Sequence, residues 1–77
     1  AIELAYAAHR MKGNMACIMN GANEIAVDAF LQDRILFHRI PQIIEKTMEK
    51  ATFVPLPDID DIYASHNQAK EIAMSLI

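Results

Sequence analysis

The apolar residues between Met15 and Gln32 constrain the fold of this chain most. They recur at intervals of three and four residues, which places them on one face of an α-helix. The stripe is broad, as expected for a helix that touches neighbours on more than one side. We therefore predict a long central helix over residues 15–32 of a helical bundle. Its apolar face comprises Met15, Ile18, Met19, Ala22, Ile25, Ala26, Ala29 and Phe30.

A segment rich in asparagine and glycine lies inside this helix. Glycine costs about 1 kcal/mol relative to alanine in a helix interior, and an asparagine amide competes for backbone groups. A helix built for stability alone would not carry Asn20, Gly21 and Asn23 so close together. Helical spacing places Asn20, Asn23 and Glu24 on one polar flank. These three are the candidate functional residues, and we expect them to form structural hydrogen bonds with a neighbouring loop or another domain.

Glycine and proline divide the rest of the chain into shorter elements. Residues 1–12 have helical spacing that ends at Gly13, and Asn14 is expected to cap the central helix. Residues 35–37 form an apolar connector that should pack against the bundle. A third helix begins near residues 39–41, where proline is tolerated in the first turn. Its predicted buried face comprises Ile40, Ile43, Ile44, Thr47, Met48 and Ala51.

Two prolines shape the segment that follows. Pro55 and Pro57 force extended backbone over residues 52–57 and remove two hydrogen-bond donors. Asp58 is expected to cap a short helical turn, and Ser65 to begin the last helix with a capping box. The candidate anchors of the extended segment are Phe53, Val54 and Leu56.

These elements predict an all-α fold with a single helical domain over residues 1–77. The domain is a small four-helix-type bundle with an extended Pro-containing connector before the last helices. A chain of 77 residues buries only about 60% of its extended surface. Hydrophobic residues make up 53% of the sequence. Either some apolar surface binds a partner, or the many alanines raise this fraction while burying little. The chain does not begin with methionine, so we expect a fragment of a longer protein or a trimmed chain.

Charge and motif spacing exclude several classes of function. The net charge of −3 argues against nucleic-acid binding, and no apolar run approaches the length of about 18 residues that a membrane span requires. Cys17 cannot form an internal disulfide and is expected to be an inert core thiol, which favours a reducing, cytoplasmic location. The histidines lack metal-binding spacing, and Asp58, Asp60 and Asp61 fit a helix start. We expect no catalytic, cofactor-binding or metal-binding residue here.

The asparagine-rich segment also carries a family resemblance. Residues 19–31, MNGANEIAVDAFL, resemble the LNAANEVAVEAFL stretch in the C-terminal domain of 1-deoxy-D-xylulose 5-phosphate reductoisomerases. Residues 34–37, 40–45 and 60–62 are similar to that family's RIxF, IPxxxE and DDV motifs. Two positions depart from the pattern. Gly21 replaces the usual alanine, which should loosen the helix slightly, and His38 with Arg39 occupies a place where an acidic residue is common.

The resemblance implies an NADPH-dependent enzyme of non-mevalonate isoprenoid biosynthesis. Such an enzyme converts 1-deoxy-D-xylulose 5-phosphate to 2-C-methyl-D-erythritol 4-phosphate with magnesium or manganese, and the parent protein is expected to be a homodimer. This chain would be its C-terminal structural domain, which buttresses the catalytic domain of the same polypeptide. No catalytic, metal or NADPH-binding residue of the family maps onto this sequence. The alternative is a free-standing helical interaction module that docks another helix through Met15 and Met19.

Overall fold

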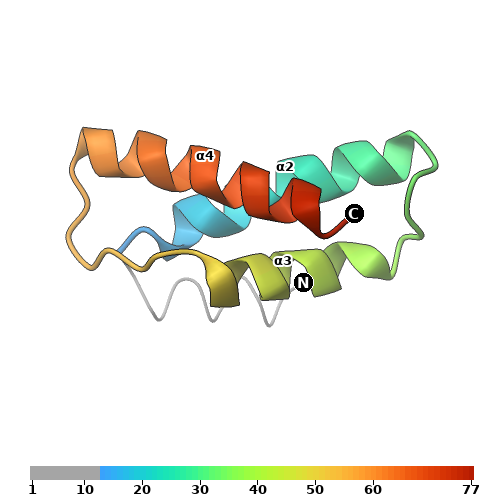
Figure 1. Ribbon diagram of the computed structural model, residues 1–77, viewed down its shortest axis with the longest axis horizontal. Coiled ribbons are helices and arrows are strands. Elements are labelled where there is room, and N and C mark those ends of the chain that lie inside the picture. The colour runs from blue at the N-terminus through green and yellow to red at the C-terminus, as the bar shows by residue number, and fades with distance from the viewer. Residues whose placement is uncertain (1–12) are drawn as a thin grey trace.

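The computed structural model describes residues 13–77, which form three α-helices and no strand. These are α2 (Met15–Leu31), α3 (Arg39–Lys50) and α4 (Ile59–Ser75). In Figure 1, α2 and α4 run in the same direction and α3 returns antiparallel to both. The prediction of an all-α fold is confirmed, and α2 ends one residue before the predicted boundary. The helix predicted over residues 1–12 lies outside the described residues.

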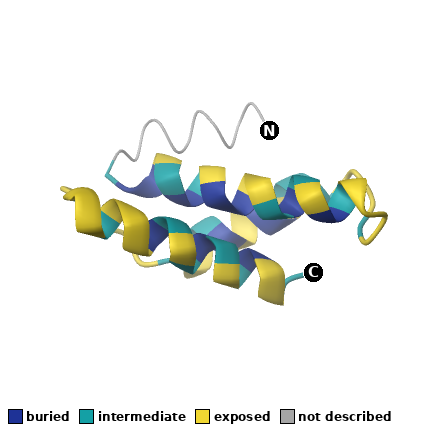
Figure 2. Ribbon diagram, turned by 90° about the horizontal axis from the view of Figure 1, so that it is seen from above, coloured by how far each residue is buried: buried dark blue, intermediate teal, exposed yellow. Residues whose placement is uncertain are grey.

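The core forms where α2 packs against α3 and α4. Each helix buries one side and exposes the other (Figure 2). Alanines line the contact between α2 and α4, whereas α3 contributes larger aliphatic side chains. Small side chains allow the two parallel helices to approach closely, which agrees with the broad apolar stripe predicted for α2. The buried apolar residues are Met15, Ile18, Ala22, Ala26, Ala29, Ile43, Ile44, Ala69 and Ala73.

A buried asparagine joins three segments at the end where α2 begins. The Nδ2 atom of Asn14 donates to the carbonyl oxygen of Thr52 at 2.8 Å and to Oγ of Ser65 at 2.7 Å. Its Oδ1 atom accepts from the backbone amide of Val54 at 2.8 Å, and the backbone amide of Asn14 donates to the Val54 carbonyl oxygen at 3.0 Å. The side chain is only 1% exposed. Asn14 therefore fixes the connector between α3 and α4 to the start of α2 and to the middle of α4.

Gly13 allows the connector to approach the start of α2. Its φ angle is +61°, a conformation that side chains rarely adopt. A Cβ atom at this position would collide with the carbonyl oxygen of Val54 and would lie 2.9 Å from the ring of Phe53. Glycine is thus required here both for backbone conformation and for space.

Two sequence-based predictions about local structure are wrong, and a third is correct only in part. Asn14 stands at the N-cap position of α2 as predicted, but its side chain does not cap the helix, because it bonds to the connector and to α4 instead. Ser65 does not begin a helix. α4 runs without interruption from Ile59, since no glycine or proline occurs within it. The capping box belongs to Asp58, whose Oδ1 accepts from the amide of Asp61 at 2.7 Å, while Asp61 accepts in return from the Asp58 amide.

The connectors pack less tightly than their apolar residues predicted. Leu36 is 68% exposed and Phe37 is 70% exposed, although the Phe37 ring contacts Phe30 edge-on at 5.4 Å between centroids. Leu56 is 90% exposed and is not an anchor of the second connector. The backbone bonds of Val54 to Asn14 hold this connector instead. Polar contacts, rather than buried apolar side chains, therefore position the chain between α3 and α4.

We expect Asn14→Ala to destabilise the chain strongly. The substitution leaves the Val54 amide, the Thr52 carbonyl and the Ser65 hydroxyl without their partner, and a buried unpaired polar group costs about 1–3 kcal/mol. We predict a loss of at least about 2 kcal/mol, out of the about 4–11 kcal/mol expected for a domain of this size. Urea unfolding followed by circular dichroism measures it. Asn67→Ala, at an exposed position of α4, is the matched control, and equal stability of the two variants would contradict the assignment.

Candidate functional site

The three candidate residues lie on the solvent-facing side of α2. Asn20, Asn23 and Glu24 are all exposed, together with Asp28 on the same helix. The side chains of Asn20 and Asn23 therefore remain accessible to a partner outside this domain. Glu24 is placed differently, because it also contacts α4.

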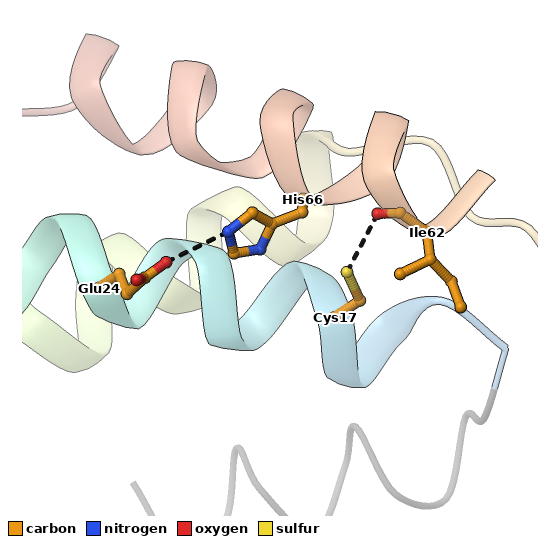
Figure 3. A network of polar contacts seen from close by, with 4 residues as sticks. All are labelled: Cys17, Glu24, Ile62 and His66. Carbon is orange, nitrogen blue, oxygen red and sulfur yellow. Dashed lines mark hydrogen bonds and ion pairs between the residues drawn. The ribbon is translucent and has the colours of Figure 1, made fainter. Parts of the chain in front are cut away.

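Figure 3 shows two polar contacts that connect α2 to α4. Nε2 of His66 lies 3.2 Å from Oε2 of Glu24, and both side chains are partly solvent-exposed. The thiol of Cys17 donates to the carbonyl oxygen of Ile62 at 3.3 Å. An exposed pair such as Glu24 and His66 contributes at most about 1 kcal/mol. These contacts align the two helices but contribute less than the buried bonds of Asn14.

Gly21 lies along α2 between Cys17 and Glu24, and it packs closely against α4. It is buried, and a Cβ atom added to it would lie 3.1 Å from the carbonyl oxygen of His66 and 3.2 Å from Cβ of Ala69. Glycine is expected to loosen α2 here, but it also lets α2 pack against α4, because any larger side chain would press on His66 and Ala69. This position therefore serves the helix contact as well as the local backbone.

The structure places Cys17 at the edge of the core and not within it. Its side chain is half-buried beside α4. Burial raises the pKa of the Cys17 thiol above its ordinary value, because a low-dielectric environment disfavours the thiolate. A smaller thiolate fraction at neutral pH makes the thiol a weaker nucleophile. Cys17 thus has the chemistry of a structural thiol.

Two hollows and the placement of the ionisable side chains bear on whether the described residues could hold a cofactor. Residues 13–77 contain no group of three histidine, cysteine or acidic side chains placed to hold a metal ion. A hollow of about 150 Å³ lies between the end of α2 and the end of α4. A second, of about 260 Å³, lies between the connector and α4. Both are smaller than the roughly 300–1,000 Å³ of typical ligand pockets, so neither accommodates a dinucleotide. None of the described helices could cross a membrane.

Sequence reasoning did not find the buried polar group formed by Asn14 and Ser65. A signal for Ser65 exists, because it precedes Ala69 by four residues and Ala73 by eight on the buried face of α4. A small polar residue in such a stripe needs a buried partner. No sequence pattern identifies that partner as Asn14, which is distant along the chain. Arg39 was also missed: it donates to Gln42 and to the carbonyl of Leu76, so it ties the start of α3 to the C-terminal end of α4.

Comparison with known proteins identifies the family. A sequence-family model described as the DXP reductoisomerase C-terminal domain matches residues 1–72. DXP stands for 1-deoxy-D-xylulose 5-phosphate. This chain belongs to the DXP reductoisomerase C-terminal domain family. The match confirms the resemblance carried by the asparagine-rich segment, and it favours a domain of a larger enzyme over a free-standing interaction module.

Relatives of this DXP reductoisomerase domain are several times longer than the chain. The chain is 50% identical to the 1-deoxy-D-xylulose 5-phosphate reductoisomerase of Bacteroides thetaiotaomicron over 99% of its length and 20% of that protein. It is 45% identical to that of Acetivibrio thermocellus over the same shares. The structure of the Zymomonas mobilis reductoisomerase in complex with NADPH matches with a TM-score of 0.89 and 39% identity, over 96% of this chain and 20% of that one. The chain thus spans about a fifth of the length of these relatives.

The close approach at Gly21 gives a size-dependent prediction. We expect Gly21→Leu to destabilise the chain by about 1–3 kcal/mol through overpacking against α4. Gly21→Ala should be nearly neutral, since a gain of about 1 kcal/mol in helix propensity offsets its tight contacts. Thermal unfolding measures both. Asn20→Leu, at the adjacent exposed position, is the control for a leucine on α2. If Gly21→Leu is as stable as Asn20→Leu, α2 and α4 are not in contact at this point.

Proposed function

We propose that this chain is the C-terminal structural domain of an NADPH-dependent 1-deoxy-D-xylulose 5-phosphate reductoisomerase. The parent enzyme would convert that substrate to 2-C-methyl-D-erythritol 4-phosphate as a cytoplasmic homodimer that uses magnesium or manganese. The observation that carries the proposal is the family match over residues 1–72, supported by relatives of that name aligned over 99% of the chain. The NADPH bound by the Zymomonas mobilis relative supports the cofactor.

The domain's role in the parent enzyme would be to support the catalytic domain of the same polypeptide. Residues 13–77 contain no group of three metal-ligating side chains, and the two hollows described above are smaller than typical ligand pockets. We therefore assign no chemical step to them. Within the parent enzyme, we retain the sequence-based prediction of a four-helix-type bundle with a Pro-containing connector. Correct placement is itself a catalytic requirement, because a shift of about 1 Å in an active site can lower the rate roughly a hundredfold.

Asn20, Asn23 and Glu24 are the residues that we propose for hydrogen bonds to the catalytic domain or to a neighbouring loop. Their exposure on α2 leaves the two asparagine amides free of the domain's own core. An asparagine side chain can both donate and accept, which suits it to backbone groups of a facing segment. Glu24 would act at the edge of this surface, since it also contacts His66.

The experiment compares the full-length enzyme with its Asn23→Ala variant. Wild-type protein should oxidise NADPH when supplied with 1-deoxy-D-xylulose 5-phosphate and magnesium, which tests the proposed activity. Asn23→Ala should lower turnover and reduce stability by about 1–3 kcal/mol, because its buried partner loses a hydrogen bond. The same substitution in the 77-residue chain should change stability by less than about 0.5 kcal/mol, since Asn23 is exposed there.

Glu49→Ala, at an exposed position of α3, is the control in both proteins. Wild-type turnover and stability in full-length Asn23→Ala would refute the proposed interdomain role. Absence of NADPH oxidation by the wild-type full-length protein would refute the proposed activity.

A further inference from the structure

Large apolar side chains gather on the surface around the start of α4. Leu56 is 90% exposed, Ile59 72%, and Tyr63 68%, while Phe53 and Ile62 are each 43% exposed. All five lie between residues 53 and 63, and we call them the α4-start surface. Soluble proteins expose single apolar residues routinely, but contiguous apolar groups mark interaction sites.

Helix geometry makes part of this surface continuous. Ile59, Ile62 and Tyr63 are separated by three and four residues, so they share one face of α4. The buried residues of α4 are Ser65, Ala69 and Ala73. Helical spacing places Ile62 toward this buried side, whereas Ile59 and Tyr63 point away from it. Phe53 lies near Gly13 at the same end of the domain, on the connector that Asn14 holds in place. Most of the apolar area of the α4-start surface is therefore left uncovered by the described residues.

Acidic residues are interspersed along the chain with the residues of this surface. Asp58, Asp60 and Asp61 flank the apolar side chains, and the stretch from Ala51 to Ala69 contains no lysine or arginine. Asp58 and Asp61 bond to each other's backbone in the capping box. An acidic rim repels a second identical copy and attracts a surface that carries lysine or arginine.

The length of the matched relatives indicates which chain could carry a complementary surface. This chain covers 20% of their length, so the parent polypeptide supplies about four times as much chain as is described here. Domains of one polypeptide pack through interfaces of roughly 600–1,500 Å². A linked domain also meets this face at high effective concentration, which a separate partner lacks.

We propose that the α4-start surface is the docking face for the rest of the parent polypeptide, through an apolar patch flanked by lysine or arginine. The proposal rests on the proposed function in assuming a longer parent chain, and it adds which face of the domain is covered. It assigns Leu56 and Ile59 as side chains that are buried only in the complete protein.

Cysteine labelling of the full-length protein tests this proposal. Leu56→Cys, Ile59→Cys and the control Glu49→Cys are each treated with a maleimide, and mass spectrometry of the modified peptide gives the rate at that site. Each rate is divided by the rate for the same variant in denaturant. Leu56→Cys and Ile59→Cys should react at least about tenfold more slowly than Glu49→Cys, because only molecules with the interface open react. All three positions are exposed in the isolated domain, so substitution should leave its fold intact.

Equal normalised rates at positions 56, 59 and 49 would overturn the proposal. Protection that disappears when the protein is diluted to the monomer would assign the face to a second copy, which would also overturn it. NADPH-dependent turnover of the same variants is measured separately. An active enzyme with unprotected positions refutes only the docking face, whereas an inactive wild-type enzyme with protected positions refutes only the activity.

Discussion

The arrangement of the three described helices depends on the buried side chain of Asn14. The contact between α2 and α4 is made largely by alanines, each of which buries little apolar area. The connector before α4 contains Pro55 and Pro57, so it lacks two of the donors that could hold it in place. Asn14 compensates for both features. It bonds to the backbone amide and the carbonyl oxygen of Val54, and to the hydroxyl of Ser65 within the core. One amide thus determines where the connector ends and where α4 lies against α2.

The features that follow from local sequence patterns were predictable. Helical spacing gave the limits of α2 to within a residue and the start of α3 within the predicted range 39–41, and it placed Asn20 and Asn23 on a polar flank, which is exposed. Features that depend on pairing across the chain were not. Asn14 and Ser65 both have the residue type of a helix cap, and only their contact over a sequence separation of 51 shows that they are a buried pair. Leu36 and Leu56 looked like anchors because apolar residues usually bury, but both are exposed in this domain.

The family to which the domain belongs suggests a role for its exposed residues. The chain spans about a fifth of the length of its relatives, and we propose that some of its surfaces meet other parts of a longer protein. The polar flank of α2 and the apolar α4-start surface differ in chemistry but are held in one geometry by the same core. Asn14 positions the connector, the connector leads into the Asp58 capping box, and the capping box sets the first turn of α4. A defect at the buried amide would therefore disturb the face that we propose for docking, even though Asn14 itself is hidden.

A double-mutant cycle between Asn14 and Ser65 tests the central role of this amide most directly. The free energies of unfolding of Asn14→Ala, Ser65→Ala and the double variant are measured in urea and compared with that of the wild-type chain. A buried hydrogen bond of 2.7 Å between the two side chains predicts a coupling energy of about 1 kcal/mol or more. Effects that add to within about 0.3 kcal/mol would show that the two residues act independently, which would contradict the role assigned to Asn14.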